Sequence, residues 1–342
     1  MREIIITAND SGRRLDRFLR KYLPGASLGE VYKVIRKDVK VDSKRRGESY
    51  ILNEGEILSL YLSDETLSAF GAPGSSNGSR LPKASPARRT FGIVYEDENI
   101  LIADKPFGLL THGDSREKKN HLANQVKDYL IASGSYDPRS EKVFVPAPVN
   151  RLDRNTTGAV LFGKTSAAMR ELNRMIREDD IRKFYMTIAC GCIDGEMHLG
   201  GSLVKDEAAN KVTISGGNDG KAVETIVRPL EVLSFGGGLS ATLCEVELVT
   251  GRSHQIRAHL AGTGHPLIGD SKYATRGAAE VNNYVNKNFG LTTQLLHAGR
   301  LEFLSSAAES ESLGYLAERA FDSPAPKRFR EIFAGLGGKK IY

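Results

Sequence analysis

A stretch rich in Gly, Ser and Pro interrupts the hydrophobic pattern early in the chain, and it requires the chain to fold as separate parts. From Phe70 to Ser79 every residue but the first is Gly, Ser, Ala, Asn or Pro, and the run from Pro82 to Arg89 adds Pro86 and three cations. Segments of this composition behave as flexible tethers. The 342 residues suffice for two domains with their own cores. We expect an N-terminal domain over 1–64, a flexible linker over 65–90, a second domain over 91–320 and a basic tail over 321–342.

The excess positive charge lies in the first fifty residues. They contain 13 Lys and Arg against 7 Asp and Glu, which accounts for the whole net charge of +6. A small basic domain on a neutral body is typical of proteins that bind an anionic polymer, most simply RNA or DNA. A membrane surface is the weaker alternative, because neither a lipidation signal nor a strongly basic amphipathic helix accompanies the charge.

The composition is that of a soluble globular protein, with 40% hydrophobic and 26% charged residues. No apolar run is long enough to span a membrane and residues 1–9 show no signal-peptide pattern, so we expect a cytoplasmic location. Cys190, Cys192 and Cys244 make no disulfide framework, and we interpret all three as buried thiols. We expect no metal, since no close Cys/His pairs complete a zinc site and the spacing of His254, His259 and His265 does not suit one.

The N-terminal domain shows two helical patterns followed by strand patterns. Apolar residues recur at helical spacing over 14–23, where Pro24 ends the helix, and again over 28–37. Ser27 with Glu30 three residues later predicts a capping box at the start of the second helix. Alternating apolar residues over 39–41 and 58–62 indicate a hairpin-like sheet. The pattern predicts one compact module.

Basic residues cover the exposed faces of these two helices. Arg13 and Arg17 on the first, and Arg36 and Lys37 on the second, are candidate RNA contacts, although solvated Lys and Arg are the ordinary case. Through residues 12–19, 34–37 and 53–56 the module resembles the S4 RNA-binding domain. The resemblance implies recognition of structured RNA through phosphate contacts and shape.

The second domain shows a hairpin pattern about residues 96–99 together with further strand and helix patterns, and we expect an α+β (mixed α/β) fold. Pro148 to Thr165 is its most informative stretch: a charged, hydroxyl-rich turn, then Gly158, then a short apolar run typical of a buried strand. Asp153 thus lies on a loop at the mouth of a strand, between Arg151 and Arg154. Two cations beside a carboxylate favour its ionised form and keep it available as a nucleophile or base. A salt-bridged structural Asp is the alternative.

Further candidates lie on other segments of this domain. Lys183-x-Tyr185 falls in a strand pattern, where the ring of Tyr185 is either core or a platform for a base. His254 and Arg257 are three residues apart and share a helix face. Lys105 and His112 belong to a Pro/Gly-punctuated loop and are potential RNA contacts, although isolated residues of this kind are more often structural or solvated.

These segments together resemble the RluA-type pseudouridine synthases. The matching motifs are Arg151-Leu152-Asp153 with Thr156-Thr157-Gly158, Lys183-x-Tyr185, residues 251–260 through Gly269-Asp270, Leu296-His297-Ala298, and the 104–108 loop with His112. The resemblance covers roughly residues 91–305 and is nearest to members that carry an S4 domain and modify large-subunit (23S) rRNA. It implies a catalytic domain built on a largely antiparallel, mixed β-sheet flanked by helices.

The resemblance also implies the reaction, isomerisation of uridine to pseudouridine in RNA without a cofactor. Asp153 would be the nucleophile, or would assist loss of a sugar proton; Arg257 would pair with it and hold it ionised. Tyr185 would stack on the uracil and help to remove the C5 proton. Arg151 or Arg154, with His112, would hold the strand opened by base flipping, and Lys183 and His254 complete the expected substrate contacts. We expect 23S rRNA or a large-subunit precursor as partner, no membrane, and a monomer.

Three positions depart from the family pattern. Asn150 stands where the family usually has His, and Asn155 and Thr157 stand where it often has Asp and Ser. These departures leave open a catalytically weak S4-type rRNA-binding assembly factor. A methyltransferase is disfavoured because Gly236-Gly237-Gly238 lacks the spacing of a nucleotide-binding turn. A glycosidase would need a second carboxylate near Asp153, and none is close in sequence.

Overall fold

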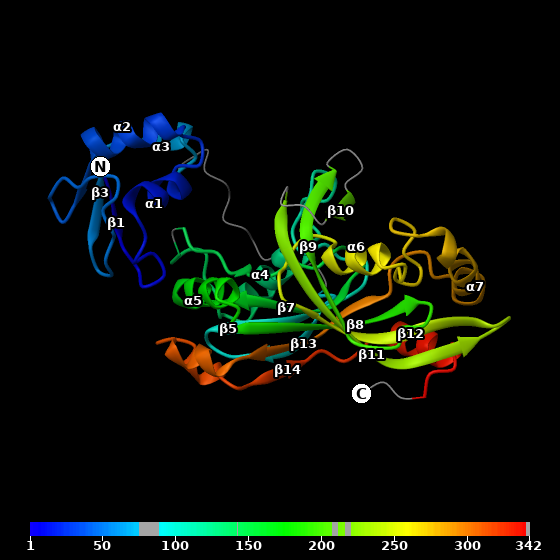
Figure 1. Cartoon of the computed structure of the whole chain (residues 1–342). Helices are drawn as coiled ribbons and strands as arrows, with labels where there is room; N and C mark the ends of the chain where they lie inside the picture. The colour runs from blue at the N-terminus through cyan, green and yellow to red at the C-terminus, as the bar shows by residue number, and fades with distance from the viewer. Residues whose placement is uncertain (75–88, 142, 207–210, 216–219, 340–342) are drawn as a thin grey trace.

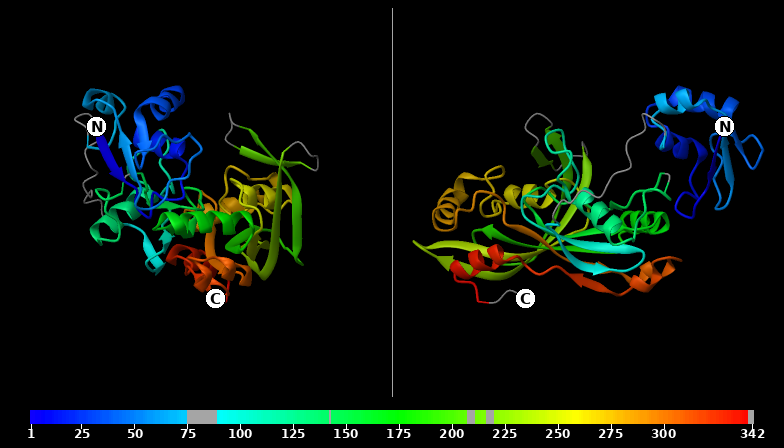
Figure 2. Two further views of the ribbon diagram at one scale, coloured as in Figure 1. Left: turned by 90° about the vertical axis from the view of Figure 1, so that its left-hand side faces the viewer. Right: turned by 180° about the vertical axis from the view of Figure 1, so that it is seen from behind.

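The computed structural model describes residues 1–74, 89–141, 143–206, 211–215 and 220–339. Within these ranges the chain forms a three-stranded sheet near the N-terminus and an 11-stranded sheet in the body. Figures 1 and 2 show the N-terminal module at one end of the body, beside α4 and α5. Most of the expected linker, residues 75–88, lies outside the described residues, so its role as a tether stays a prediction.

The N-terminal module packs two helices on its small antiparallel sheet, which has the order β1-β3-β2. The Ser27 side chain accepts from the Glu30 amide, and the Glu30 side chain accepts from the Ser27 amide. The predicted capping box at the start of α2 is therefore confirmed. The core also takes Leu67 and Ala72, which are C-terminal to the expected boundary at residue 64. Its elements are β1 (Arg2–Ile5), α1 (Leu15–Tyr22), α2 (Leu28–Asp38), β2 (Val39–Val41), β3 (Ile57–Leu60) and α3 (Asp64–Ala69).

The sheet of the body has the order β10-β9-β11-β12-β8-β13-β7-β5-β4, with β14 paired to β13 and β6 to β7. All pairs are antiparallel except β13 with β7, so the expected α+β fold on a largely antiparallel, mixed sheet is confirmed. The strands are β4 (Gly92–Glu96), β5 (Ile100–Lys105), β6 (Ala147–Pro148), β7 (Thr157–Gly163), β8 (Ile181–Cys190), β9 (Met197–Asp206), β10 (Lys211–Ser215), β11 (Lys221–Phe235), β12 (Leu239–Leu248), β13 (Leu296–Phe303) and β14 (Ala320–Asp322).

Helices cover both faces of this sheet, and each face carries its own hydrophobic clusters. One cluster places Leu101, Val160, Tyr185 and Val246 beneath α4 and α6, the side on which the site described below lies. The helices are α4 (Leu122–Ala132), α5 (Ser166–Arg177), α6 (Gln255–Gly262), α7 (Ala279–Phe289) and α8 (Lys327–Gly335), with 3-10 turns at Arg276–Ala278, Ser305–Glu309 and Gly314–Leu316.

Two expectations outside the site are wrong. The segment predicted as a basic tail forms β14 and α8, and α8 buries Phe329, Ile332 and Phe333 against α7 and the sheet. Two prolines and several cations obscured this apolar face in the sequence. Cys192 is exposed, unlike Cys190 and Cys244, because it follows the end of β8 instead of lying within a strand.

Candidate active site

The loop that carries Asp153 is fixed at both ends. At its C-terminal end, Gly158 has φ +109° and pairs with Ala298 of β13, where a Cβ would lie 2.2 Å from the Ala298 carbonyl oxygen. Only glycine allows this close approach. Before the turn, the Leu152 amide donates to the Thr111 hydroxyl (3.1 Å), which donates back to the Leu152 carbonyl (3.0 Å). The Asp153 backbone is therefore placed by strand pairing and by a second loop.

Lys105 holds the same loop from beneath. Its side chain is fully buried, and Nζ donates to the carbonyls of Leu109 (2.7 Å), Arg154 (3.0 Å) and Pro106 (3.2 Å). Burial lowers the pKa of Lys105 to about 7, while three carbonyl acceptors favour its protonated form. The predicted RNA contact is therefore wrong, because the Lys105 amino group donates to backbone carbonyls and does not reach the surface.

Asp153 faces two basic side chains from the start of α6. Its Oδ2 lies 3.3 Å from Nη1 of Arg257 and 3.7 Å from Nε2 of His254. The expected pair between Asp153 and Arg257 is thus present. Among the described residues Oδ1 of Asp153 has no hydrogen-bond partner, so one carboxylate oxygen is held and the other is available.

A second carboxylate, Asp270, orients the arginine. Arg257 donates to Asp270 through Nε (2.7 Å) and Nη2 (2.9 Å), and both side chains are buried. Burial lowers the pKa of Arg257, but the Asp270 and Asp153 carboxylates raise it above its ordinary value. The sequence contained Gly269-Asp270 as part of a motif, but nothing local showed that this carboxylate would bind Arg257.

His254 occupies a strained position at the start of α6. Its φ is +56°, uncommon for a residue other than Gly, and Nδ1 lies 3.0 Å from the Tyr273 hydroxyl. Burial lowers the pKa of His254, more strongly than the Asp153 charge raises it, so the ring is neutral at pH 7. Arg257 is therefore the stable cation beside Asp153.

Tyr185 and Lys183 lie on the same face of β8, because strand residues two apart share a face. The Tyr185 ring is 6% exposed and forms part of the cavity wall. Burial, and then the Asp153 charge, raise the pKa of Tyr185, so its hydroxyl stays protonated at neutral pH. Lys183 also lines the cavity and donates to the Ile181 carbonyl (3.2 Å); this location suits a contact inside the cavity and not one with a surface phosphate.

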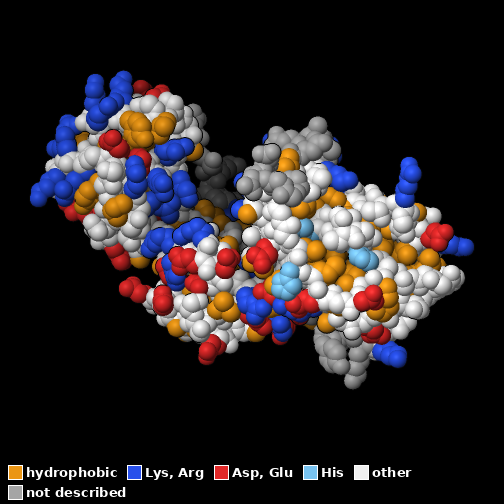
Figure 3. All heavy atoms as spheres, viewed as in Figure 1, with side chains coloured by type: hydrophobic (Ala, Val, Ile, Leu, Met, Phe, Trp, Pro, Cys, Tyr) orange, Lys and Arg blue, Asp and Glu red, His pale blue; other side chains and the backbone are white. Residues whose placement is uncertain are grey.

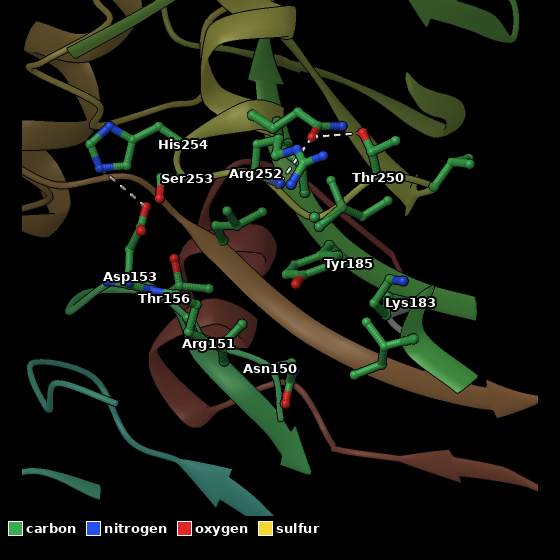
Figure 4. Close-up of a pocket in the computed structure, with 18 of the residues that line it drawn as sticks. Asn150, Arg151, Asp153, Thr156, Lys183, Tyr185, Thr250, Arg252, Ser253 and His254 are labelled. Atoms are coloured by element: carbon green, nitrogen blue, oxygen red, sulfur yellow. Dashed lines mark hydrogen bonds and ion pairs between the residues drawn. The ribbon is translucent and has the colours of Figure 1, made fainter. Parts of the chain in front are cut away.

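A cavity of about 590 Å³ opens in front of Tyr185, and a second hollow of about 570 Å³ adjoins it. Asp153, His254 and Arg257 line both, so the carboxylate stands at their junction. Figure 4 shows Asp153 and Tyr185 pointing into the same hollow from the loop and from β8. The first cavity is large enough for a nucleoside and has an apolar wall, made by Leu248, Ile256 and Leu296.

The remaining predicted contacts lie at the rim or on the N-terminal module. His112 and Arg151 line both hollows, and Arg154 lines the second and pairs with Asp114 at 3.4 Å. Burial lowers the pKa of His112. Arg17, Arg36 and Lys37 are exposed on the N-terminal module, where Arg13 is partly buried.

Two of the departures from the family pattern have structural roles here. The Asn150 side chain donates to the Ala159 carbonyl (3.3 Å) and accepts from the Leu161 amide (2.8 Å), so it clamps the loop to β7. The Thr157 hydroxyl contacts Nδ1 of buried His297 at 2.9 Å. Neither change removes a group from Asp153, Tyr185 or Arg257.

Among the described residues, no three His, Cys, Asp or Glu side chains are grouped to hold a metal ion. In the same part of the chain, no helix is long and apolar enough to cross a membrane.

Comparisons with known proteins point to one family. A family model described as RNA pseudouridylate synthase matches residues 99–262. The ribosomal large subunit pseudouridine synthase C of Vibrio cholerae serotype O1 is 32% identical over 311 residues, covering 90% of each chain. The protein of the same name from Escherichia coli K12 is 30% identical over 308 residues, covering 88% of each. Human RNA pseudouridylate synthase domain containing 4 shares the fold, with TM-score 0.51, 21% identity, and coverage of 72% of this chain and 93% of that one.

Proposed function

Because the chain belongs to the RluA-type RNA pseudouridine synthase family, which isomerises uridine to pseudouridine within RNA, we propose that it acts on large-subunit ribosomal RNA with Asp153 as the nucleophile. The observation that carries the catalytic assignment is the carboxylate at the junction of two hollows, paired through one oxygen with Arg257 and open at the other. The relatives named for the large ribosomal subunit and the basic N-terminal module support the choice of RNA.

In this reaction the target uridine leaves its stack and enters the cavity against Tyr185. Oδ1 of Asp153 attacks C1′ as the N1–C1′ bond breaks, and the bond electrons leave with the uracil. The uracil turns within the cavity, and its C5 attacks C1′ and displaces the carboxylate. Loss of the C5 proton and protonation of N1 complete pseudouridine, so no atom is gained or lost.

Each side chain has a role that its surroundings allow. Arg257 pairs with the Asp153 carboxylate and orients it, since its own position is fixed by Asp270. Tyr185 supplies a ring for the base; because its hydroxyl is protonated, it can take the C5 proton only while passing its own to another acceptor. The apolar wall keeps water from the uracil while it is detached.

Several features of the proposal concern the whole protein. We place the enzyme in the cytoplasm, where large-subunit rRNA is assembled into ribosomes in bacteria such as those of its relatives. A monomer is sufficient, because one chain carries both the basic module and the cavity. No cofactor is required, since the electrons of the broken bond stay with the base.

The test is pseudouridine mapping after incubation with unmodified 23S rRNA. Wild type should form pseudouridine at defined uridines, and Asp153→Asn, which keeps the shape and removes the charge, should form none. Asp114→Asn is the matched control, because Asp114 is exposed at the rim and pairs only loosely with Arg154. The catalytic assignment is wrong if Asp153→Asn matches wild type, and the substrate assignment is wrong if wild type modifies no large-subunit uridine.

A further inference from the structure

The N-terminal module is joined to the catalytic domain by specific contacts in addition to the linker. Asn9 makes two of them: its amide nitrogen donates to Glu141 Oε1 (2.6 Å), and its oxygen accepts from the backbone amide of Ser166 (2.9 Å). Ser166 begins α5, so Asn9 satisfies one of the free amides at the start of this helix. The module thus supplies a capping group to a helix of the other domain.

Apolar and backbone contacts complete the joint. Val143 of the catalytic domain is buried within the core of the N-terminal module. Arg170 of α5 donates to the Ser11 carbonyl (3.3 Å), and its guanidinium lies beside Gly12, where a Cβ would be 3.5 Å from it. These contacts set the direction in which α1 faces along α5.

Several cations lie close together at the joint between the N-terminal module and the catalytic domain. Arg13 lies close enough to Arg170 for the second cation to lower its pKa, after the larger effect of burial. Lys21 of α1 is affected by Arg13 in the same way. The carboxylate of buried Asp10 opposes these effects at both cations. A cluster of three cations across a domain joint attracts an anion.

Exposed cations of α5 lie between this joint and the cavity. Arg170 and Arg177 are seven residues apart, which is two helical turns or roughly 10 Å, on one side of the helix. Arg177 lines the cavity that contains Tyr185, and among the described residues it has no carboxylate partner. By contrast, Arg174 between them is neutralised by Glu171, Glu178 and Asp180.

Two acidic residues follow Arg177 in the chain. Glu178 pairs with Arg174, and Asp179 lines the same cavity as Arg177. In Figure 3 blue side chains gather over the N-terminal module and at its border with the body, where red side chains also lie. The basic groups of α2, Arg36 and Lys37, belong to a different helix from those that face the joint.

We propose that α1 and α5 form one RNA-binding surface, on which the backbone of the substrate strand runs from the joint to the cavity and places phosphates against Arg170 and Arg177. This inference rests on the proposed function, because it takes RNA as the substrate. It assigns to α5 the task of guiding the strand that flanks the target uridine. Phosphate contacts of this kind set register and position without reading sequence.

The test measures binding of an unmodified large-subunit rRNA fragment as a function of salt, for Arg177→Gln and for the double variant Arg170→Gln/Arg177→Gln. Removal of one phosphate-binding cation should reduce the slope of log affinity against log salt by about 0.7–0.9. If variant and wild type bind equally at 1 M salt, this smaller slope corresponds at 0.15 M salt to about fivefold weaker binding per cation removed. Arg330→Gln on α8 is the matched control, since Arg330 is exposed and belongs to a helix remote from the joint.

Pseudouridine formation by wild type on the same fragment is measured first, which separates the two proposals. If wild type forms none, the proposed function fails. If wild type is active but both α5 variants keep its affinity and salt slope, the RNA-binding surface is refuted while the function stands. The surface is also refuted if affinity and salt slope change in the double variant but not in Arg177→Gln. The effect would then come from Arg170 alone, through its contacts at the domain joint. The inference requires that the slope of log affinity against log salt is smaller in Arg177→Gln than in wild type, and smaller again in the double variant.

Discussion

Asp270→Asn is the change that most directly probes how the catalytic carboxylate is held. The substitution keeps the shape of the side chain but removes a negative charge that receives two bonds from Arg257, at 2.7 and 2.9 Å. Asp270 is 1% exposed, so water cannot replace the lost acceptor. Removing one partner of a buried ion pair costs about 3–5 kcal/mol.

We expect the lower end of this range, about 3 kcal/mol, because Asp153 remains as a second counter-ion for Arg257 at 3.3 Å. That is roughly a 150-fold fall in the folding equilibrium constant, or a melting temperature lower by about 6–12 °C for a domain of this size. Activity measured well below the melting temperature should fall about 100-fold, since a misplaced Arg257 no longer aims Asp153.

Urea unfolding and thermal melting give the stability, and single-turnover pseudouridine formation gives the rate. The matched change is Asp114→Asn, whose ion pair with Arg154 is exposed and whose two turn bonds an Asn oxygen can keep. Its effect on stability should be below about 1 kcal/mol. If Asp270→Asn is no less stable than Asp114→Asn and as active as wild type, Asp270 does not anchor Arg257.

Three further outcomes follow from the structure. Tyr185→Phe keeps the ring and removes the hydroxyl, so RNA affinity should hold while the single-turnover rate falls about 100-fold or more; an unchanged rate would remove the hydroxyl from the chemistry. Burial lowers the pKa of His297 below its unfolded value of about 6.5. The unfolded chain therefore binds this proton first, so stability is complete above about pH 6.5 and falls as the pH drops toward the folded pKa, by up to about 1.4 kcal/mol per unit. Urea unfolding at pH 7 and pH 5 should show a smaller loss in His297→Gln than in wild type, and an equal loss would assign the effect to other groups. Deleting residues 1–72, with the cut after Ala72 because it belongs to the N-terminal core, should weaken rRNA binding and flatten its salt dependence; an unchanged affinity and slope would exclude the module from RNA binding.

Local patterns were sufficient where a feature depends on neighbours in the sequence. The capping box at Ser27 uses two residues of one turn, and the strand after Gly158 is a continuous apolar run. The pairing of Asp153 with Arg257 was expected from the family motifs, and the structure contains it at 3.3 Å. Lys105 shows the limit of this reasoning, because a lysine in a Pro/Gly loop carries no local sign that it will be fully buried.

By itself the sequence determined the α+β class, the basic N-terminal module and the loop that presents Asp153, since composition, periodicity and turn residues act over a few positions. Only the tertiary structure decided which groups surround that carboxylate. Asp270 reaches Arg257, Lys105 reaches the Arg154 carbonyl, and Asn9 reaches the start of α5 across 157 positions. Such contacts depend on which elements pack together, and burial then decides whether a charged side chain serves the substrate or the protein's own backbone.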